Sequence, residues 1–388
     1  MDNKRKVCIV TGTRAEWGLL SGIAQQLRMR DDVELQIVAT NMHLDPRYGH
    51  TIDDILAQGF EVDVRVPMIA DDDSITSTVK AMAKCLDGMA DAFAQLTPDM
   101  IVILGDRYEM LSVASAATVM RIPIVHLHGG EISEGAIDDS IRHAITKLSS
   151  LHLTATEEYR NRVIQMGENP DRVINTGAIG VYNVAHIEPM SLNELNESLN
   201  FEITPGTLLV TYHPATLDDE DVALRCQALL DALDAFPDNK VIITYPNNDA
   251  QGRVIIDMIE AYASNNKGRV LVKPSLGLLR YISALHYVGA VVGNSSSGII
   301  EVPSMHIPTV NIGMRQQGRI ASESVIHCGD DSASIVDAIK LALSQEGRAK
   351  AQKASNPYCK DNTLQLIVEA IATTPLETLK RKSFYDLK

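Results

Sequence analysis

The amino-acid sequence predicts an α/β protein with two doubly wound domains, each built on a parallel β-sheet. Three observations support this fold class. Short apolar runs rich in β-branched residues alternate with helical patterns along the whole chain. These runs lack polar alternation, which is typical of parallel strands covered by helices on both faces. The chain also has 388 residues, more than a single hydrophobic core usually serves, and two domains are therefore expected.

The first half of the chain alternates predicted strands and helices in the βαβ rhythm of a doubly wound sheet. Apolar, β-branched runs predict strands at 7–12, 33–40, 100–105 and 122–130. Apolar residues at helical spacing predict helices at 15–30, 76–96, 110–120 and 141–151.

The pattern restarts after residue 170 and predicts a second sheet. A short helix and a linker are expected within 190–206. Strands are expected at 207–214, 240–248, 269–274, 290–298 and 307–313. We therefore predict an N-terminal domain of residues 1–175 and a C-terminal domain of residues 176–362. The last helix, within 363–388, is expected to pack back on the first domain.

Composition and charge narrow the class of partner. The formal net charge of −15 argues against non-specific binding to nucleic acid or to an anionic membrane. No window reaches the ~18 consecutive apolar residues of a membrane span, and the first residues lack a signal-peptide core. The five cysteines form no CxxC pair, which favours free thiols in a reducing compartment. We expect a cytoplasmic protein that acts on a small molecule.

Two strand-to-helix turns carry donors that suit a phosphate group. TGTRAEWG (11–18) offers a tight turn, a helix N-terminus and Arg14, although it is not the GxGxxG of dinucleotide-binding proteins. GNSSSGIIEVPS (293–304) offers hydroxyl and amide donors. It also contains Glu301, whose carboxylate suits a ribose diol. The structural alternatives are a plain turn with a surface arginine and a solvated loop with a capping serine.

Two further motifs follow predicted strands of the second half. NIGMRQQGR (311–319) carries Arg315, which suits a phosphate or a base, or else lies in solvent. TYHPAT (211–216) places His213 at a strand end, where it either faces a ligand or is a satisfied loop histidine.

Carboxylates and histidines gather in two motifs of the first half. Asp106 in GDRYE (105–109) follows the most apolar strand, where open α/β sheets bind ligands, although aspartate also caps helices well. HLHGGEISEGAIDDSIRH (126–143) crowds three histidines with four carboxylates. General acid–base chemistry is the preferred interpretation because clustered carboxylates raise one another's pKa. A metal site is the weaker alternative, since no complete metal signature appears.

All of these motifs lie at the carboxyl ends of predicted strands. The sequence therefore predicts a cleft with an acidic wall from the first half and a phosphate-binding wall from the second. A nucleotide sugar fits both walls. A glycosyltransferase and a non-catalytic nucleotide-binding protein remain alternatives at this point.

In their order and spacing, these motifs resemble the hydrolysing UDP-N-acetylglucosamine 2-epimerases of bacterial sialic acid biosynthesis (the NeuC type). The resemblance also includes IDDSIRHAITKLS and PNND, and covers nearly the whole chain. It implies a GT-B arrangement of two Rossmann-like domains with a cleft between them, in a homodimer or homotetramer. The implied reaction converts UDP-N-acetylglucosamine and water to N-acetylmannosamine and UDP through a 2-acetamidoglucal, without a metal or other cofactor.

The resemblance also implies roles for individual residues. Asp106, Glu131 and Asp138 are expected to face the sugar, with Asp106 or Asp138 as base and acid. His213 is expected to stabilise the departing UDP. The residues expected to bind UDP are Arg14, Arg107, His213, Asn247, Ser295, Ser296, Ser297, Gly298, Glu301 and Arg315.

One position departs from the family pattern. His128 stands where many relatives carry a glutamate with a catalytic role, so either His128 or Glu131 is expected to take that role. This departure leaves room for another substrate, a UDP-2,4-diacetamido-2,4,6-trideoxyhexose on a legionaminic acid route. A non-hydrolysing 2-epimerase is the remaining alternative within the family.

Overall fold

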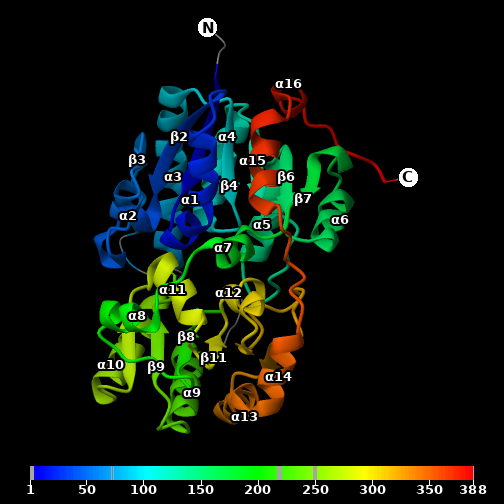
Figure 1. Cartoon of the computed structure of the whole chain (residues 1–388). Coiled ribbons are helices and arrows are strands. Elements are labelled where there is room, and N and C mark those ends of the chain that lie inside the picture. Colours follow the sequence, from blue (N-terminus) through cyan, green and yellow to red (C-terminus); the bar gives the residue numbers. More distant parts are fainter. Residues whose placement is uncertain (1–3, 71, 73, 216–220, 248–250, 388) are drawn as a thin grey trace. The chain divides into compact units, whose positions relative to one another are not determined.

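The structure, a computed structural model, describes residues 4–70, 72, 74–215, 221–247 and 251–387 (Figure 1). The chain forms two compact units. Unit 1 comprises Met1–Glu131, Asp138–Tyr182 and Lys360–Lys388. Unit 2 comprises Ile132–Ile137 and Asn183–Cys359.

Unit 1 is built on a parallel sheet of seven strands in the order β3-β2-β1-β4-β5-β6-β7. Because all pairs are parallel, the carboxyl ends of the strands lie along one edge of the sheet. The strands are β1 (Arg5–Thr11), β2 (Val33–Thr40), β3 (Val64–Val66), β4 (Met100–Leu104), β5 (Ile124–Leu127), β6 (Leu151–Thr154) and β7 (Val173–Asn175).

Helices cover both faces of this sheet. Alternate residues of β1 enter two separate hydrophobic cores: Val7 and Ile9 in one, Cys8 and Val10 in the other. This alternation is the geometry of a strand buried on both faces. The helices are α1 (Arg14–Arg28), α2 (Ile52–Ala57), α3 (Ile75–Leu96), α4 (Tyr108–Val119), α5 (Asp138–Leu148), α6 (Glu157–Gln165), α7 (Ile179–His186), α15 (Thr363–Thr373) and α16 (Leu376–Leu379), with 3-10 turns at Asn41–Leu44, Pro46–Tyr48 and Pro170–Arg172.

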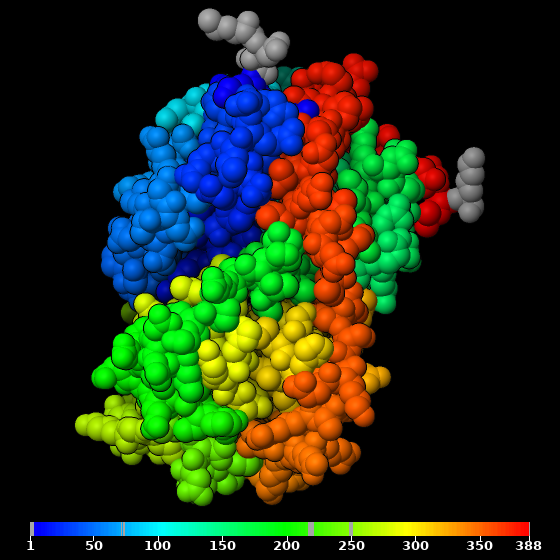
Figure 2. Space-filling model, viewed as in Figure 1, coloured from blue at the N-terminus to red at the C-terminus, as the bar shows by residue number. Residues whose placement is uncertain are grey.

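The chain returns to unit 1 after Cys359, and α15 packs beside α1 (Figure 2). The Arg5 guanidinium donates to the carbonyl of Ile371 at 2.7 Å, and Arg30 pairs with Glu369 at 3.4 Å. Ile371 is fully buried in the same core as β1 and α1. Residues from both ends of the described chain therefore share one core.

Unit 2 is built on a parallel sheet of six strands in the order β10-β9-β8-β11-β12-β13. Neighbouring residues of β8 again enter different cores, Leu208 on one face and Leu209 on the other. The strands are β8 (Leu208–Thr211), β9 (Val241–Thr244), β10 (Val270–Lys273), β11 (Ala290–Gly293), β12 (Thr309–Ile312) and β13 (Val325–Cys328).

The helices of unit 2 connect these strands. They are α8 (Leu192–Leu199), α9 (Val222–Asp234), α10 (Gly252–Asn265), α11 (Gly277–Leu285), α12 (Ser297–Ile300), α13 (Ser332–Leu343) and α14 (Gln345–Lys353), with a 3-10 turn at Val302–Met305. At the end of β11, Gly293 has a φ of +139°, and a Cβ there would lie 1.9 Å from the carbonyl oxygen of Thr211. Only glycine allows this close approach of β11 to β8.

The predicted fold class is confirmed: the chain forms two Rossmann-like α/β domains, each on a parallel sheet. Two predicted helices are present but differ in extent from the prediction. The helix expected over 141–151 ends at Leu148, because the amide of Ser150 donates to the Ile124 carbonyl and the chain enters β6 at Leu151. The helix expected after the serine loop is the single turn α12, because Pro303 lacks the amide hydrogen that would continue it, and a 3-10 turn follows.

We searched the described residues for a helix long and apolar enough to cross a membrane, and found none.

Candidate active site

The loops after β1, β4 and β5 lie side by side in unit 1, because these strands are neighbours in the sheet. Their carboxyl ends bring Arg14, Asp106 and His128 to one edge, the edge at which open α/β sheets bind ligands. Arg14 is the first residue of α1, and Arg107 directly precedes α4. The structure thus gathers the N-terminal candidate residues at one place in unit 1.

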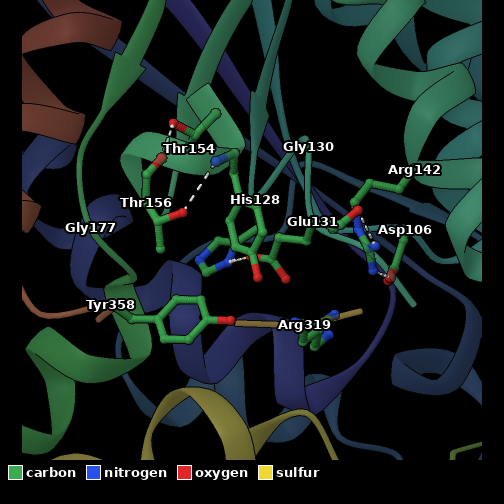
Figure 3. A network of polar contacts seen from close by, with 12 residues as sticks. Asp106, His128, Gly130, Glu131, Arg142, Thr154, Thr156, Gly177, Arg319 and Tyr358 are labelled. Carbon is green, nitrogen blue, oxygen red and sulfur yellow. Dashed lines mark hydrogen bonds and ion pairs between the residues drawn. The ribbon is translucent and has the colours of Figure 1, made fainter. Parts of the chain in front are cut away.

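His128 and Glu131 form a buried pair at the end of β5 (Figure 3). Nδ1 of His128 lies 2.7 Å from Oε1 of Glu131, and the two side chains are 11% and 2% exposed. A carboxylate can only accept hydrogen bonds, so Nδ1 carries a hydrogen, and in the neutral ring Nε2 keeps its lone pair. This histidine can therefore accept a proton through Nε2.

The backbone of His128 adopts a φ of +64°, in the left-handed region. Such a conformation is costly for a residue other than glycine and is common at functional sites. The histidine also lies beyond β5, so the HLH sequence does not present both rings on one face of a strand. His126 instead approaches the carbonyl of Gly105 through Nε2 at 2.7 Å.

Arg142 of α5 organises the acidic side chains around it. Its guanidinium is 1% exposed and forms an ion pair with Asp106, whose side chain is 21% exposed (Figure 3). It also donates to the carbonyl oxygen of Glu131 at 2.9 Å and lies 3.9 Å from Asp139. One buried cation thus joins the loops after β4 and β5.

The first turn of α5 carries two further carboxylates of the motif. Asp138 and Asp139 are its first two residues, a favourable place for negative charge on a helix. His143 lies 3.5 Å from Asp139, and burial lowers its pKa despite that carboxylate. In the described part of the chain, no group of three or more His, Cys, Asp or Glu side chains is arranged to hold a metal ion.

Two buried carboxyl groups, those of Glu16 and Glu109, lie beside the TGTRAEWG turn. Glu16 closes a capping box with Thr13, and its Oε2 accepts from the amide of Gly12 at 2.7 Å. Glu109 accepts from Asn41 at 2.7 Å and from Arg107 at 2.9 Å. Arg107 therefore neutralises a buried carboxylate. The pKa of Glu16 is raised to about 8 by burial and by the charge of Glu109.

In unit 2, the loops after β8 and β11 are clamped together by Asn294. Its Oδ1 accepts from the amide of His213 at 2.7 Å, and its Nδ2 donates to the His213 carbonyl at 2.8 Å. Nδ1 of His213 accepts from the amide of Asn247 at 3.2 Å, which leaves Nε2 with the ring hydrogen. His213 and Asn247 are thus brought together. The last residues of TYHPAT and PNN, 216 and 248, lie outside the described residues.

The serine-rich loop (293–304) and the loop that carries Arg315 (311–319) meet at Asn294. Arg315 donates to the Asn294 carbonyl at 3.1 Å, and Gln316 donates to it at 2.9 Å. Ser297 contacts the hydroxyl of Tyr281 at 2.5 Å. The other candidates of this loop are Ser295 and Ser296 before α12, Gly298 within it and Glu301 directly after it.

Six residues of the acidic loop, Ile132–Ile137, belong to unit 2. The amide of Glu134 donates to the Gln317 carbonyl at 3.2 Å, and Arg319 contacts the Ser133 hydroxyl at 3.3 Å. Within unit 2, Ser133 and Glu134 are therefore anchored on the segment that carries Arg315.

Sequence reasoning missed Arg142 and Asn294 as organising residues. A basic side chain on the buried face of α5, three residues before Ile145, was the available signal for Arg142. No local signal marked Asn294, because His213, the partner of its side chain, lies 81 residues away in sequence.

Comparison with known proteins decides the family. The model of the UDP-N-acetylglucosamine 2-epimerase family matches residues 25–372. The chain belongs to this family of enzymes. The match does not single out the type found in sialic acid biosynthesis.

Three relatives match this epimerase-family chain over nearly its whole length. A GDP/UDP-N,N'-diacetylbacillosamine 2-epimerase (hydrolysing) of Campylobacter jejuni is 38% identical over 99% of this chain and 100% of its own. The polysialic acid biosynthesis protein P7 of Escherichia coli is 37% identical, covering 99% and 98%. A UDP-N,N'-diacetylbacillosamine 2-epimerase (hydrolysing) of Legionella pneumophila is 35% identical, covering 96% and 97%.

Among solved structures, the chain resembles a UDP-GlcNAc 2-epimerase of Neisseria meningitidis, crystallised bound to UDP-GlcNAc. The TM-score is 0.79 at 16% sequence identity, with 95% of this chain and 100% of that chain covered. At this identity the likeness establishes the fold of the family in this protein.

Proposed function

We propose that this protein is a hydrolysing 2-epimerase that converts a UDP-2-acetamido sugar and water to UDP and the free sugar epimerised at C2. The observation that carries the proposal is the buried His128–Glu131 pair beside the Asp106–Arg142 ion pair, a constellation suited to moving a proton. Two relatives matched over nearly their whole length are named hydrolysing 2-epimerases, which supports the same reaction.

In the proposed first step, a base removes the proton from C2 of the sugar while the C1–O bond breaks. The electron pair of that bond leaves with the β-phosphate oxygen of UDP, and a 2-acetamidoglucal forms. His128 is the proposed base, because Glu131 holds its Nδ1 and leaves Nε2 with a lone pair. The weakly acidic C2 proton requires such a positioned base.

In the proposed second step, water adds across the glycal. Its oxygen bonds to C1, and a proton reaches C2 on the face opposite to the first removal. Asp106 or Asp138 is the proposed proton donor, since both lie near Arg142 at the same edge of the sheet in unit 1. Water that supplies both hydroxyl and proton balances the overall reaction.

UDP is proposed to lie on unit 2. Nε2–H of His213 is the proposed donor to the diphosphate. Arg14 and Arg107 stay proposed UDP-binding residues. The Asn294 clamp supports this role, because it fixes the backbone of His213 from both sides. The remaining proposed UDP contacts are Asn247, Ser295, Ser296, Ser297, Gly298, Glu301 and Arg315.

Two sugars are candidate substrates. UDP-N,N'-diacetylbacillosamine, a 2,4-diacetamido-2,4,6-trideoxyhexose, is the first candidate, because relatives at 38% and 35% identity carry it in their names. UDP-N-acetylglucosamine, with N-acetylmannosamine as product on a sialic acid route, is the second. It is supported by the description of the family and by the polysialic acid relative.

We propose a cytoplasmic homodimer or homotetramer. The cysteines Cys8, Cys85 and Cys226 are free and buried, as is usual in a reducing compartment. Light scattering coupled to size-exclusion chromatography tests the assembly, and a monomeric mass would contradict it.

Incubation of the protein with each UDP-sugar in deuterated water tests the reaction. We expect free UDP and a free sugar with deuterium at C2. A labelled UDP-sugar without free UDP would instead indicate a non-hydrolysing epimerase. Free UDP with an unlabelled C2 would indicate hydrolysis or glycosyl transfer without epimerisation. If neither UDP nor label appears with either sugar, the proposed activity on these two substrates is wrong.

A further inference from the structure

A short segment after α16, Arg381–Tyr385, packs on unit 1. In sequence it lies far from the loops that carry the candidate catalytic residues. In Figure 1 it is the red trace that follows α16. We name it the strap. The strap backbone is exposed, but the side chain of Lys382 turns inward and is 25% exposed.

Lys382 satisfies the end of α5. Its Nζ donates to the carbonyl oxygens of Lys147 and Ser149, at 2.6 Å each, and approaches that of Thr146 at 3.3 Å. The last carbonyls of a helix lack intrahelical partners and carry partial negative charge, so a cation stabilises them. The same α5 carries Arg142, which pairs with Asp106.

Glu168 is the second partner of Lys382. This carboxylate is 4% exposed and lies 2.8 Å from Lys382, 2.5 Å from Lys147 and 3.0 Å from Nε2 of His152. Burial alone would raise its pKa, but the hydrogen bonds from His152, Lys147 and Lys382 outweigh burial and lower the pKa to about 2. Glu168 is therefore an anion that collects three donors.

Two more residues of the strap fix its position. The amide of Tyr385 donates to the carbonyl of Gly167 at 2.9 Å. The ring of Phe384 lies over the Lys147 ammonium at 5.0 Å, and a Cβ on Gly167 would lie 2.3 Å from that ring. Glycine at 167 therefore leaves the space that the strap fills.

From Glu168 the contacts lead back to the candidate active site. His152 is fully buried and is paired in register with His126 across β5 and β6. His126 donates through Nε2 to the carbonyl of Gly105, the residue before Asp106. A Cβ on Gly129 would lie 3.0 Å from Nδ1 of His126, so this ring also supports the loop that starts with His128.

We propose that Lys382 is a positioning residue for the acid–base site. It holds the end of α5 and, through Glu168, His152 and His126, the loops that carry Asp106 and His128. This inference rests on the proposed epimerase function. The physical reason is that the ion pairs and hydrogen bonds of Lys382 and Glu168 restrain the elements that they join, and small displacements of catalytic groups reduce rate strongly.

The test compares Lys382→Met with Lys380→Met in the full chain. Lys380 is the matched control because it lies two residues away and pairs only with the exposed Glu377 among the described residues. We expect Lys382→Met to lower kcat roughly tenfold or more, with KM within about twofold, because the loops move and UDP binding does not change. Lys382→Arg, which keeps the charge, is expected to recover part of kcat, and Lys380→Met to match the unmodified chain.

A second measurement does not depend on turnover. In protein isotopically labelled at histidine, we expect the NMR signals of the His126 and His152 rings to shift in Lys382→Met. The same signals should stay unchanged in Lys380→Met. If the unmodified chain turns over neither sugar, the proposed function fails and these signals alone decide the positioning role.

Two results would overturn the inference. The first is unchanged kcat in folded Lys382→Met, even if its melting temperature falls, since the strap would then be structural only. The second is unchanged histidine signals. If Lys382→Met does not fold, Phe384→Ala, which loosens the strap at an exposed ring, replaces it in both measurements under the same criteria.

Discussion

The individual side chain with the strongest case for chemistry is His128. Its positive φ, its burial and its 2.7 Å contact with Glu131 all constrain one ring in one orientation. The carboxylate decides the tautomer, and the tautomer decides that Nε2 is the proton acceptor. His128, the residue at which the resemblance implies a departure from the family pattern, is thus held in one orientation.

Glu131→Gln tests this pair. The substitution keeps size and shape but removes the negative charge that fixes the tautomer. We expect kcat for UDP release to fall by roughly 10²-fold or more, with little loss of stability, because general acid–base catalysis contributes on that order. The matched control is Glu134→Gln in the same loop, where the side chain is exposed and kcat should remain unchanged. If kcat for UDP release is equal in both variants, the His128–Glu131 pair does not take part in the mechanism.

Glu16 predicts a pH dependence of stability. Its pKa is raised by burial and by Glu109 to about 8 in the folded protein, against an ordinary value of 4.5. The folded state thus holds this proton more tightly, so the contribution to stability is full below about pH 4.5 and is lost as the pH rises to 8.

Glu16→Gln removes this titration and keeps the acceptor for the Gly12 amide. As the pH rises from 5 to 8, we expect the unmodified chain to lose unfolding free energy relative to Glu16→Gln. The loss should be up to about 1.4 kcal/mol per pH unit. Urea titrations at three pH values measure it. Glu194→Gln is the control, because Glu194 is exposed and its pKa is lowered by hydrogen bonds from Ser191. A constant difference for Glu16→Gln would show that Glu16 is ionised throughout.

At the scale of elements, the two units start a helix with the same device. Thr13 and Glu16 form a capping box at α1, and Ser191 and Glu194 form one at α8. Only the first lies in a strand-to-helix turn at the edge where the candidate site is built. A comparison of the two capping boxes therefore separates the contribution of a cap to stability from its effect on the candidate site.

Thr13→Ala and Ser191→Ala are expected to lower the unfolding free energy by about 1 kcal/mol each, the usual cost of losing an N-cap. Only Thr13→Ala is expected to reduce UDP release, severalfold and chiefly through KM, because Arg14 follows the cap directly. Denaturation and initial rates measure the two effects. A parallel loss of activity in Ser191→Ala would contradict the assignment of the TGTRAEWG turn to the site.

At the scale of the whole molecule, the chain builds two separate sets of hydrophobic cores. Ile371, near the far end of the sequence, belongs to the core of β1 and α1, whereas Ile339 belongs to a core of unit 2. Both side chains are fully buried. Because domains generally unfold as cooperative units, each should report on its own unit.

Ile371→Ala and Ile339→Ala are each expected to cost about 2–5 kcal/mol, the usual range for a buried isoleucine truncated to alanine. Differential scanning calorimetry should show Ile371→Ala lowering the transition of unit 1 and Ile339→Ala that of unit 2. A single transition lowered equally by both variants would show that the units unfold together.

Much of the architecture was predictable because periodicity is a local property. The runs at 33–40 and 76–96 correspond to β2 and α3 within a residue. The strands β3, β6, β7 and β13 were missed because each contains a polar residue and forms no apolar run that stands out from the flanking sequence.

The sequence by itself determined the fold class and placed every candidate motif at the carboxyl end of a strand, because strand and helix periods are written in neighbouring residues. The family of enzymes followed from comparison, while the roles of the site residues stay predictions. Only the tertiary structure decided which partners these residues have. Arg142 pairs with Asp106, Asn294 holds His213, and Lys382 pairs with Glu168, although the members of each pair lie far apart in sequence. Such contacts depend on the order of strands in a sheet, and no local pattern in the sequence encodes that order.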